Sequence, residues 1–481
     1  MNFDLLVIGS GPAGQKAAVQ ASKLGKRAAV IERMTTVGGV SINSGTIPSK
    51  TLREAVLYLT GYQQRGFYGH DYAVKTGITM ADLLHRADHV IQSEIEITKH
   101  QLARNEIEVI NGTASFVDPH TLSVAGEHGT SLVSGSKILI ATGSEAARDP
   151  HIPFDGHNVL TSDDLLRLPD VPKSLVVVGA GVIGSEYTSV FAALGLPVTL
   201  IDRRACLLPF VDREIGDGLT QHLRDLGAEL IFEDDVQTIV PGSLDLVDVH
   251  LVSGRVVRAD VVLYAVGRIG ATAGLNLSAA GLEADARGRI PVDRNYQTAV
   301  PHIYAAGDVI GNPALAATSM EQGRLAACHA FGAPEDTAVL PLPYAIYTVP
   351  EIAMLGPTEE ELRAAGRQYL LGRAYYREIA RGQILGDVTG FLKLIFKHDT
   401  GHLMAVHALG TQASELIHIG QAVLGLGGGV DFLLDSVFNY PTLAECYKIA
   451  ALDAANQMRK AGLTPLQTAD APRFFRDTGQ S

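Results

Sequence analysis

The chain contains two copies of one local pattern: an apolar run, a glycine-rich turn, a helical stretch and a second apolar run that ends in an acid. The first copy turns through residues 9–14 (Gly-Ser-Gly-Pro-Ala-Gly) and ends at Glu32. The second turns through residues 179–184 (Gly-Ala-Gly-Val-Ile-Gly) and ends at Asp202. Each acid follows the first glycine of its turn by 23 positions. The duplication predicts two strand, turn, helix and strand units, and therefore an α/β fold.

A turn of this kind suits a dinucleotide. Two glycines let the backbone approach a pyrophosphate, and the third lets the helix pack on the strand. The helix N-terminus offers N–H groups to the anion, and the acid accepts a hydrogen bond from a ribose hydroxyl. One copy alone could serve packing, but two matched copies predict two dinucleotide sites. Their residues are Gly9, Gly11, Gly14 and Glu32 in the first site, and Gly179, Gly181, Gly184 and Asp202 in the second.

Composition narrows the class of protein. A chain of 481 residues with 46% hydrophobic and 19% charged residues is typical of a globular enzyme of two or three domains. The formal net charge of −13 disfavours nucleic acid as a partner. Acids interrupt the first apolar run before it reaches the length of a signal peptide or spanning helix, which favours the cytoplasm and no membrane. Three scattered cysteines indicate buried, reduced thiols, with neither a disulfide framework nor a zinc site.

A third segment indicates which cofactor each of the two sites binds. Residues 298–308 form an apolar run that ends in Gly307 and Asp308, which alone would indicate only a turn after a strand. In its order along the chain the segment resembles the second flavin motif of two-dinucleotide-binding flavoproteins, whose aspartate binds the ribityl chain of FAD. The segments that lead into Gly143 and Gly267 resemble the two domain crossings of those proteins. The resemblance assigns FAD to the first site and a nicotinamide nucleotide to the second.

Nearly the whole chain resembles the class I pyridine nucleotide-disulfide oxidoreductases, of the lipoamide dehydrogenase and glutathione reductase type. The resemblance implies two Rossmann-like dinucleotide-binding domains plus a C-terminal α+β dimerisation domain, with one FAD per subunit and a homodimer or larger homo-oligomer. The implied domains are 1–150 and 271–340 for FAD, 151–270 for NAD(P) and 341–481 for dimerisation. Local sequence patterns predict that the first helix ends at Gly25, that a strand at 391–396 precedes two apolar helices, and that the tail from Lys460 is mobile.

The redox cysteines of that family are missing. Ser41 and Thr46 stand at their positions, and hydroxyl groups cannot form a redox disulfide. We interpret both residues as small polar side chains beside FAD. Pro48 is predicted to begin a helix that carries Lys50, which the family places near flavin N5 and pairs with a glutamate at the position of Glu186.

The catalytic histidine of the family is also missing. Tyr440 replaces it, whereas the downstream Glu445 is retained. Tyrosine, with an ordinary pKa near 10, is a poor base at neutral pH, so we assign both residues structural roles at the flavin cavity. Histidines 402, 407 and 418 are interpreted as core or interface residues and not as metal ligands.

Without the thiols and the histidine, the chemistry left to the protein is hydride exchange between nicotinamide and flavin. This reaction requires the two rings to be held in position and requires no redox disulfide. The segments around Thr46 and Tyr440 are similar to those of soluble pyridine nucleotide transhydrogenases, a subgroup that often keeps the first cysteine. We therefore predict a ping-pong enzyme in which NADPH reduces FAD and NAD⁺ reoxidises it. NAD(H) and NADP(H) are its substrates. The alternatives are an NAD(P)H:quinone or dye reductase on the same scaffold and a flavin redox sensor without turnover.

Nucleotide choice at the second site depends on the residues after its acid. An acid favours the 2′-hydroxyl of NAD, and an arginine favours the 2′-phosphate of NADP. Here Asp202 is followed by Arg203 and Arg204. If Asp202 turns outward while an arginine pairs with the phosphate, one site can serve both nucleotides. The alternative is that both arginines are solvated, since an arginine also follows Glu32.

Overall fold

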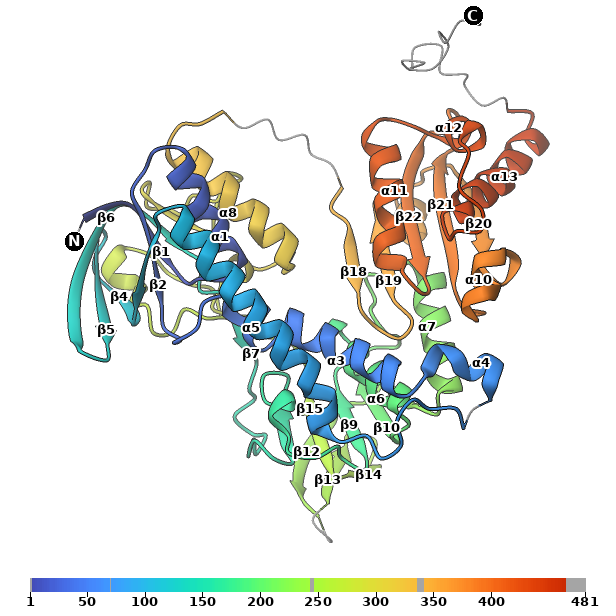
Figure 1. Cartoon of the computed structure of the whole chain (residues 1–481), viewed down its shortest axis with the longest axis horizontal. Coiled ribbons are helices and arrows are strands. Elements are labelled where there is room, and N and C mark those ends of the chain that lie inside the picture. The colour runs from blue at the N-terminus through green and yellow to red at the C-terminus, as the bar shows by residue number, and fades with distance from the viewer. Residues whose placement is uncertain (1, 70, 243–245, 335–340, 464–481) are drawn as a thin grey trace, which may run out of the picture. The chain divides into compact units, whose positions relative to one another are not determined.

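The computed structural model describes residues 2–69, 71–242, 246–334 and 341–463. The predicted mobile tail lies outside the described residues from position 464 onward. Contacts between residues group the chain into two compact units (Figure 1). Unit 1 contains residues 1–62, 73–205 and 227–338, and unit 2 contains residues 63–72, 206–226 and 339–481. Each unit is described by itself.

The first sheet of unit 1 has seven strands in the order β3-β2-β1-β6-β5-β4, with β17 also paired to β6. Its strands are β1 (Asn2–Ile8), β2 (Ala28–Glu32), β3 (Glu108–Asn111), β4 (Thr113–Asp118), β5 (Thr121–Gly126), β6 (Gly129–Ile140) and β17 (Ile303–Ala305). The end of β6 pairs in parallel with both β1 and β17, whereas its beginning pairs antiparallel with β5. The carboxyl ends of β1, β6 and β17 therefore meet at one edge, where parallel sheets carry their ligands.

The second sheet repeats this arrangement. Its five strands are parallel and follow the order β11-β10-β9-β15-β8. They are β8 (Val159–Thr161), β9 (Leu175–Val178), β10 (Val198–Asp202), β11 (Glu229–Phe232) and β15 (Val261–Tyr264). Smaller sheets join β12 (Val236–Pro241), β13 (Val247–Leu251) and β14 (Val256–Ala259), and pair β7 (Ser144–Ala146) with β16 (Arg268–Gly270). Strand orders β3-β2-β1 and β11-β10-β9 match the two predicted Rossmann-like units.

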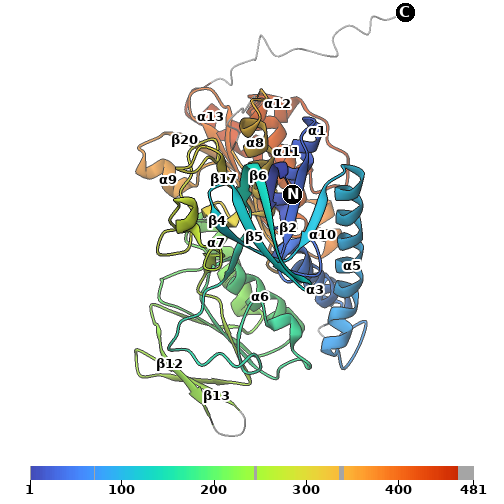
Figure 2. The same ribbon diagram turned by 90° about the vertical axis from the view of Figure 1, so that its left-hand side faces the viewer.

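The helices of unit 1 are α1 (Pro12–Lys23), α2 (Gly39–Asn43), α3 (Thr46–Leu59), α5 (Met80–Arg104), α6 (Val182–Leu194) and α8 (Ala316–Ala330). Helix α1 ends as predicted, with Gly25 at φ +72° just beyond it. Helix α8 packs beside α1 (Figures 1 and 2), so closely that a side chain at Gly323 would collide with the backbone of Ala13. Each glycine-rich turn thus leads directly into a helix, α1 or α6.

One helix boundary differs from the prediction. Helix α3 begins at Thr46 with Gly45 as its N-cap, two residues before Pro48. Proline is tolerated there because the first N–H groups of a helix have no acceptor within it. Lys50 consequently lies in the second turn of α3 and not in the first.

Unit 2 is built on an antiparallel sheet in the order β18-β19-β22-β21-β20. Its strands are β18 (Tyr344–Ile346), β19 (Ile352–Leu355), β20 (Tyr369–Tyr375), β21 (Phe391–Lys397) and β22 (Leu403–Leu409). Its helices are α4 (Arg65–Tyr68), α7 (Arg213–Asp225), α9 (Glu359–Ala364), α10 (Ala380–Leu385), α11 (Ala413–Gly425), α12 (Val430–Asp435) and α13 (Glu445–Lys460). The predicted strand at 391–396 and the two apolar helices after it are thus present.

The core of unit 2 lies between its sheet and helices α11 and α13. Leu392, Leu394 and Phe396 of β21 point into this core together with Tyr447 of α13. Because side chains alternate along a strand, Lys393 points to the opposite face, where it is fully buried against Asp212. His407 of β22 is also buried, and burial lowers its pKa. His402 precedes β22, and His418 is exposed on α11, so they lie in separate elements.

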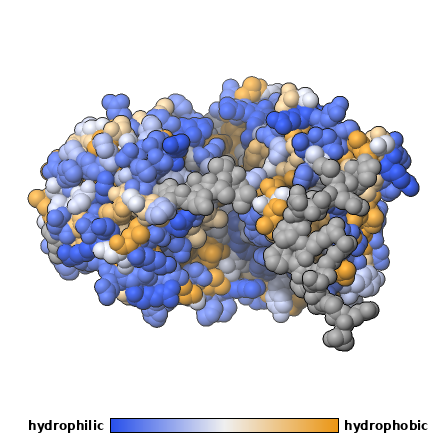
Figure 3. Space-filling model, turned by 90° about the horizontal axis from the view of Figure 1, so that it is seen from above, coloured by the Kyte–Doolittle hydropathy of each residue, from blue (hydrophilic) through white to orange (hydrophobic). Residues whose placement is uncertain are grey.

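The face drawn in Figure 3 is mostly hydrophilic, with apolar residues among the polar ones. Within the described ranges, no helix combines the length and the apolar character needed to span a bilayer.

Candidate functional site

The first glycine-rich turn connects β1 to α1. Gly9 has a φ of +103°, and any side chain there would collide with the carbonyl oxygen of Ala141 at the end of β6. This position requires glycine for both its conformation and its space. The turn opens a cavity of about 210 Å³ at the carboxyl edge of the first sheet.

Most of the residues predicted to bind FAD line this cavity. They are Gly9, Gly11, Glu32, Ser41, Thr46, Gly143 and Asp308. Gly14 and Lys50 are not in the lining. Gly14 instead lies in the first turn of α1 against Gly9, where an added Cβ would collide with the Gly9 carbonyl. Its role is helix packing, as expected for the third glycine of the turn.

Glu32 is held in the cavity by a short network. Its Oε2 accepts hydrogen bonds from the backbone N–H and the hydroxyl of Ser10, at 2.9 and 2.6 Å, and its Oε1 accepts one from the Met34 N–H at 2.9 Å. The Ser10 hydroxyl also accepts a hydrogen bond from the Gly38 N–H. The network fixes the carboxylate while leaving lone pairs of Oε1 available to a ribose hydroxyl. Sequence reasoning missed Ser10, although its place between the first two glycines could have indicated it.

Asp308 follows β17 and is connected to the crossing strands β7 and β16. The Ser144 hydroxyl donates to Asp308 at 2.8 Å, and Arg268 Nε donates to the same hydroxyl at 2.9 Å. Arg268 also forms an ion pair with Asp163 at 3.0 Å. The chain segments at Gly143 and Gly267, which were predicted as domain crossings, are therefore held together by Ser144 and Arg268. Ser144, Arg268 and Asp163 were not among the predicted site residues.

The cavity fits a flavin dinucleotide in two respects. Backbone at Gly9 and Gly11 lines it beside the N-terminus of α1, which suits a pyrophosphate. The buried Thr142 hydroxyl in its lining has no hydrogen-bond partner among the described residues. A buried hydroxyl without a partner is uncommon in proteins, and a bound ligand would supply the missing partner.

Lys50 and Glu186 meet although they belong to different helices. The ammonium of Lys50 on α3 lies 2.8 and 2.7 Å from the two carboxylate oxygens of Glu186 on α6. The side chain of Glu186 is 9% exposed and that of Lys50 is 25% exposed. The pair thus links the helix that follows the missing thiols to the helix of the second glycine-rich turn.

The positions of the missing thiols lie on two short neighbouring helices. Ser41 is on α2 and Thr46 is the first residue of α3, and both line the flavin cavity. None of the three cysteines forms a disulfide, and none lines the cavity. Cys328 and Cys446 are buried as predicted, whereas Cys206 is exposed. The cavity consequently offers hydroxyl groups where a disulfide reductase needs thiols.

The second glycine-rich turn connects β9 to α6. Gly179 has a φ of +107°, and an added Cβ would lie 2.6 Å from the carbonyl oxygen of Ala265. Gly181 is the N-cap of α6, and Gly184 lies in its first turn. Gly267 lies beyond β15 at φ +139°. The geometry at Gly179 repeats that at Gly9.

Asp202 lies at the carboxyl end of β10, with its side chain 4% exposed. It accepts hydrogen bonds from the Ala180 N–H at 2.5 Å and from Arg204, whose Nε and terminal nitrogen donate at 2.8 and 2.6 Å. Burial raises the pKa of Asp202, but the hydrogen bonds from Arg204 and Ala180 outweigh burial and hold the pKa below its usual value. Arg203 is exposed. The structure therefore distinguishes the two arginines that the sequence left equivalent.

Tyr440 and Glu445 lie in unit 2. The side chain of Tyr440 is 75% exposed, and Glu445 is the first residue of α13, where its carboxylate accepts from the Thr442 N–H at 3.4 Å. Their predicted place at the flavin cavity requires a partner subunit and stays a prediction.

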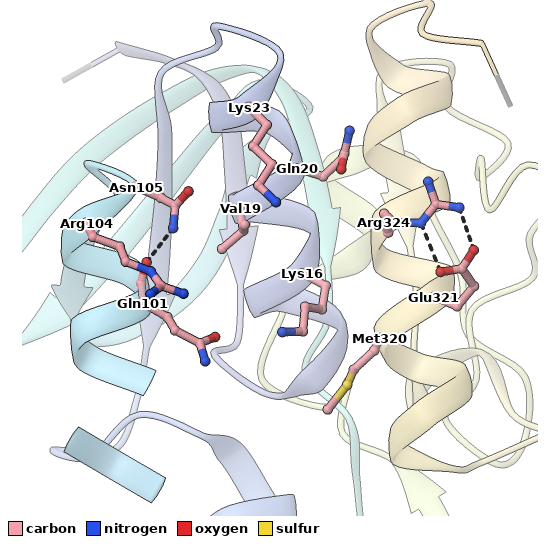
Figure 4. A pocket seen from close by; sticks show the side chains of 10 residues that line it. All are labelled: Lys16, Val19, Gln20, Lys23, Gln101, Arg104, Asn105, Met320, Glu321 and Arg324. Carbon is pink, nitrogen blue, oxygen red and sulfur yellow. Dashed lines mark hydrogen bonds and ion pairs between the residues drawn. The ribbon is translucent and has the colours of Figure 1, made fainter. Parts of the chain in front are cut away.

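A larger groove, of about 550 Å³, lies on unit 1 between α1, α5 and α8 (Figure 4). Lys16, Lys23 and Arg104 extend into it, while Arg324 pairs with Glu321 on α8. It contains no residue of either glycine-rich turn. The cavity at the first turn therefore remains the candidate cofactor site, because it brings a glycine-rich turn, Glu32 and Asp308 together.

The chain matches two models of known families. Residues 3–323 match the pyridine nucleotide-disulphide oxidoreductase model, and residues 342–451 match the dimerisation domain of the same family.

Curated relatives of similar length carry one name. A "Soluble pyridine nucleotide transhydrogenase" of Mycobacterium tuberculosis is 52% identical over 95% of this chain and 98% of its own length. The protein of that name from Colwellia psychrerythraea is 42% identical over 95% of this chain and 99% of its own.

Solved structures agree in fold. LpdA from Mycobacterium tuberculosis superposes with a TM-score of 0.86 at 27% identity, covering 93% of this chain and 99% of its own. The HOCl-induced flavoprotein disulfide reductase RclA from Escherichia coli superposes with a TM-score of 0.83 at 30% identity, covering 93% of this chain and 99% of its own. With the two glycine-rich turns, the cavity at the first and the matched dimerisation region, these findings show that the chain belongs to the pyridine nucleotide-disulphide oxidoreductase family.

Proposed function

We propose that the chain is an FAD-dependent transhydrogenase that transfers a hydride from NADPH to NAD⁺ by a ping-pong sequence at one nicotinamide site. The observation that carries the proposal is the flavin cavity, in which Ser41 and Thr46 replace both thiols while the two dinucleotide turns are intact. The name shared by the relatives at 42–52% identity supports it. Direction depends on nucleotide concentrations, with NADPH oxidation as the expected sense.

The residues of the first site hold the cofactor. Bound FAD supplies the chemistry, since it accepts a hydride from one nicotinamide and returns it to another. Glu32 receives a ribose hydroxyl, Asp308 receives the ribityl chain, and Gly9 and Gly11 line the pyrophosphate. Ser41 and Thr46 fill the space of the thiols without taking part in electron transfer.

Lys50 and Glu186 are the catalytic residues of the proposal. An ammonium held close to the flavin stabilises negative charge on the ring, and Glu186 fixes the ammonium through both of its oxygens. Because Glu186 lies on the helix of the second turn, the same pair also lies beside the proposed nicotinamide site. Positioning then supplies most of the catalysis.

The second site would bind the nucleotides through Gly179, Gly181 and Gly184, with Asp202, Arg203, Arg204 and Gly267 around the adenosine half. We retain the predicted division into FAD (1–150 and 271–340), NAD(P) (151–270) and dimerisation (341–481) domains as part of the proposal. The structure adds that residues 206–226, within the predicted NAD(P) domain, make most of their contacts in unit 2.

A homodimer is the proposed assembly. Unit 2 carries exposed apolar side chains, with Leu426 at 88%, Val437 at 93% and Tyr440 at 75% exposure. Such residues mark protein interfaces, and they belong to the region matched by the dimerisation model. In the dimer, Tyr440 and Glu445 would reach the partner's flavin cavity. A cytoplasmic location is proposed because none of the three cysteines forms a disulfide.

Anaerobic stopped flow tests the function. The purified yellow protein is reduced with one equivalent of NADPH and then mixed with NAD⁺, while flavin absorbance and NADH are followed. Rapid return of the absorbance with an equal amount of NADH is the expected result. If the flavin stays reduced until a quinone is added, the protein is an acceptor reductase. If NADPH does not bleach the flavin, the sensor function applies.

A further inference from the structure

The carboxylate of Asp202 has no accepting capacity left. Its Oδ1 accepts from the backbone N–H and the Nε of Arg204, both at 2.8 Å. Its Oδ2 accepts from the Ala180 N–H at 2.5 Å and from a terminal guanidinium nitrogen of Arg204 at 2.6 Å. A carboxylate has about four lone-pair positions, and all four are used. A ribose 2′-hydroxyl therefore cannot donate to Asp202 while the side chain of Arg204 stays in place.

Arg204 is the movable partner of this pair. Asp202 is buried and anchored to the glycine-rich turn through Ala180, whereas the Arg204 side chain is 43% exposed. When the pair separates, the half-exposed guanidinium can turn into water, whereas the buried carboxylate stays in place. The hypothesis that Asp202 turns outward is thus replaced by one in which Arg204 does.

The first site lacks this arrangement. Glu32 is also followed by an arginine, but its oxygens accept from Ser10 and Met34. In the described part of the chain, Arg33 makes no hydrogen bond to Glu32, and its side chain is exposed. An arginine bound to the acid therefore occurs at the second site and not at the first. The second site is the one that, in the proposed function, binds NAD(H) and NADP(H) in turn.

We propose that Arg204 is a two-state specificity residue that reads the 2′ substituent of the adenosine ribose. In the closed state seen here, it neutralises Asp202 through its Nε and one terminal nitrogen, and in this state the same guanidinium would contact a 2′-phosphate. In the open state, Arg204 turns to solvent, and the freed lone pairs of Asp202 accept a 2′-hydroxyl. NADP(H) selects the closed state and NAD(H) the open state. The inference rests on the proposed function, since only an enzyme that uses both nucleotides needs both states.

The test uses the adenosine half alone, with the FAD-loaded protein and isothermal titration calorimetry. The probes 2′,5′-ADP and 5′-AMP differ only in the 2′-phosphate. In Arg204→Ala, 2′,5′-ADP is expected to bind about 10- to 100-fold more weakly, as for loss of a charge-assisted contact. Binding of 5′-AMP is expected to stay equal or to tighten, because Asp202 is already free. Arg204→Lys is expected to recover part of the 2′,5′-ADP affinity.

Two comparison variants make the result specific. Arg224→Ala removes the same charge from an exposed position on α7 and should leave both affinities within about twofold. Arg203→Ala should weaken 2′,5′-ADP less than Arg204→Ala does. The inference is overturned if Arg204→Ala weakens both probes equally, if it leaves 2′,5′-ADP unchanged, or if Arg203→Ala causes the larger loss.

Failure of the inference can be told apart from failure of the function, because probe binding needs no hydride transfer. Weaker binding of 2′,5′-ADP without weaker binding of 5′-AMP supports the role of Arg204 even if NAD⁺ does not reoxidise the flavin in stopped flow. Normal transfer between nucleotides, combined with equal effects on both probes, overturns the role of Arg204 and leaves the proposed function standing.

Discussion

The Lys50 ammonium sits between the two carboxylate oxygens of Glu186, 136 positions further along the chain. The contact joins α3, which follows the positions of the missing thiols, to α6, which follows the second glycine-rich turn. The charged pair that we propose for catalysis is therefore present although both thiols are absent. Ser41 and Thr46 remove disulfide chemistry, while the pair can still serve hydride transfer.

Replacing Lys50 by methionine should slow reduction of the flavin by NADPH about 10²- to 10³-fold, because one preorganised charge is removed. Glu186→Gln should cost less, since an amide oxygen still accepts from the ammonium. Stopped-flow absorbance measures both rates, and Lys99→Met, a change at an exposed lysine on α5, serves as the control. Unchanged reduction in a fully FAD-loaded Lys50→Met variant would remove Lys50 from the catalytic residues.

Gly9 and Gly179 hold equivalent positions in the two turns. Replacing each by alanine should show which cofactor each turn binds. Gly9→Ala is expected to abolish FAD retention, because its Cβ has no space in the first turn. Gly179→Ala is expected to give a yellow protein that NADPH no longer bleaches. Flavin content and bleaching are read by absorbance, and Gly195→Ala, at positive φ but in open space, controls for backbone strain alone. A colourless Gly179→Ala with normal circular dichroism would reverse the assignment of the sites.

Thiol reagents should not inhibit the enzyme. Iodoacetamide is expected to label Cys206, which is exposed, and to spare Cys446, because burial raises the pKa of that thiol to about 12. Mass spectrometry of the native protein identifies the labelled site, and transfer between nucleotides is measured before and after labelling. More than a twofold loss after prior reduction with a dithiol would indicate that a thiol takes part after all.

The buried charges of unit 2 should control its stability. Lys393 donates to Glu359 at 2.6 Å and to Asp212 at 2.9 and 3.0 Å. Lys393→Met would leave both carboxylates without this cation and should cost about 3–5 kcal/mol in the free energy of unfolding. The exposed Lys397, on the same strand, is the matched control, with an expected change of about 0.5 kcal/mol or less for Lys397→Met. Chemical denaturation measures both.

The same charges set a pH window for stability. Burial raises the pKa of Glu359, but the hydrogen bond from Lys393 holds it below its ordinary value of 4.5. Its contribution is therefore present above pH 4.5 and is lost as the pH falls below that value. Burial lowers the pKa of Lys393, but hydrogen bonds to Glu359 and Asp212 raise it above 10.5, so its contribution is lost only at still higher pH. The melting temperature should therefore not fall between pH 5 and 10 because of these groups, and such a fall would contradict the assigned pKa directions. In Lys393→Met, the loss of stability at low pH and the loss at high pH should both be smaller.

The sequence by itself determined the elements around both turns. Apolar periodicity, the glycines and the terminal acids are local features, so β1, α1, β2 and their counterparts β9, α6, β10 could be predicted, as could the end of α1 before Gly25. Gly9, Gly11 and Glu32 of the cavity lining followed from the same motifs, whereas Ser41, Thr46, Gly143 and Asp308 followed from the family resemblance and Ser10 was missed. The N-terminus of α3 was predicted two residues late, because proline fits several positions in a first helical turn.

Tertiary structure alone decided which side chains meet. The contact of Ser144 with Asp308, the burial of Lys393 against Asp212 and the grouping of residues 206–226 with unit 2 join segments that are distant in sequence. Even between near neighbours the sequence was insufficient, since Arg203 and Arg204 are equivalent in it. The strand ending at Asp202 directs the carboxylate into the protein, and only the fold determines which arginine side chain lies over it. Local patterns fix the backbone, whereas contacts between side chains depend on the packing of the whole unit.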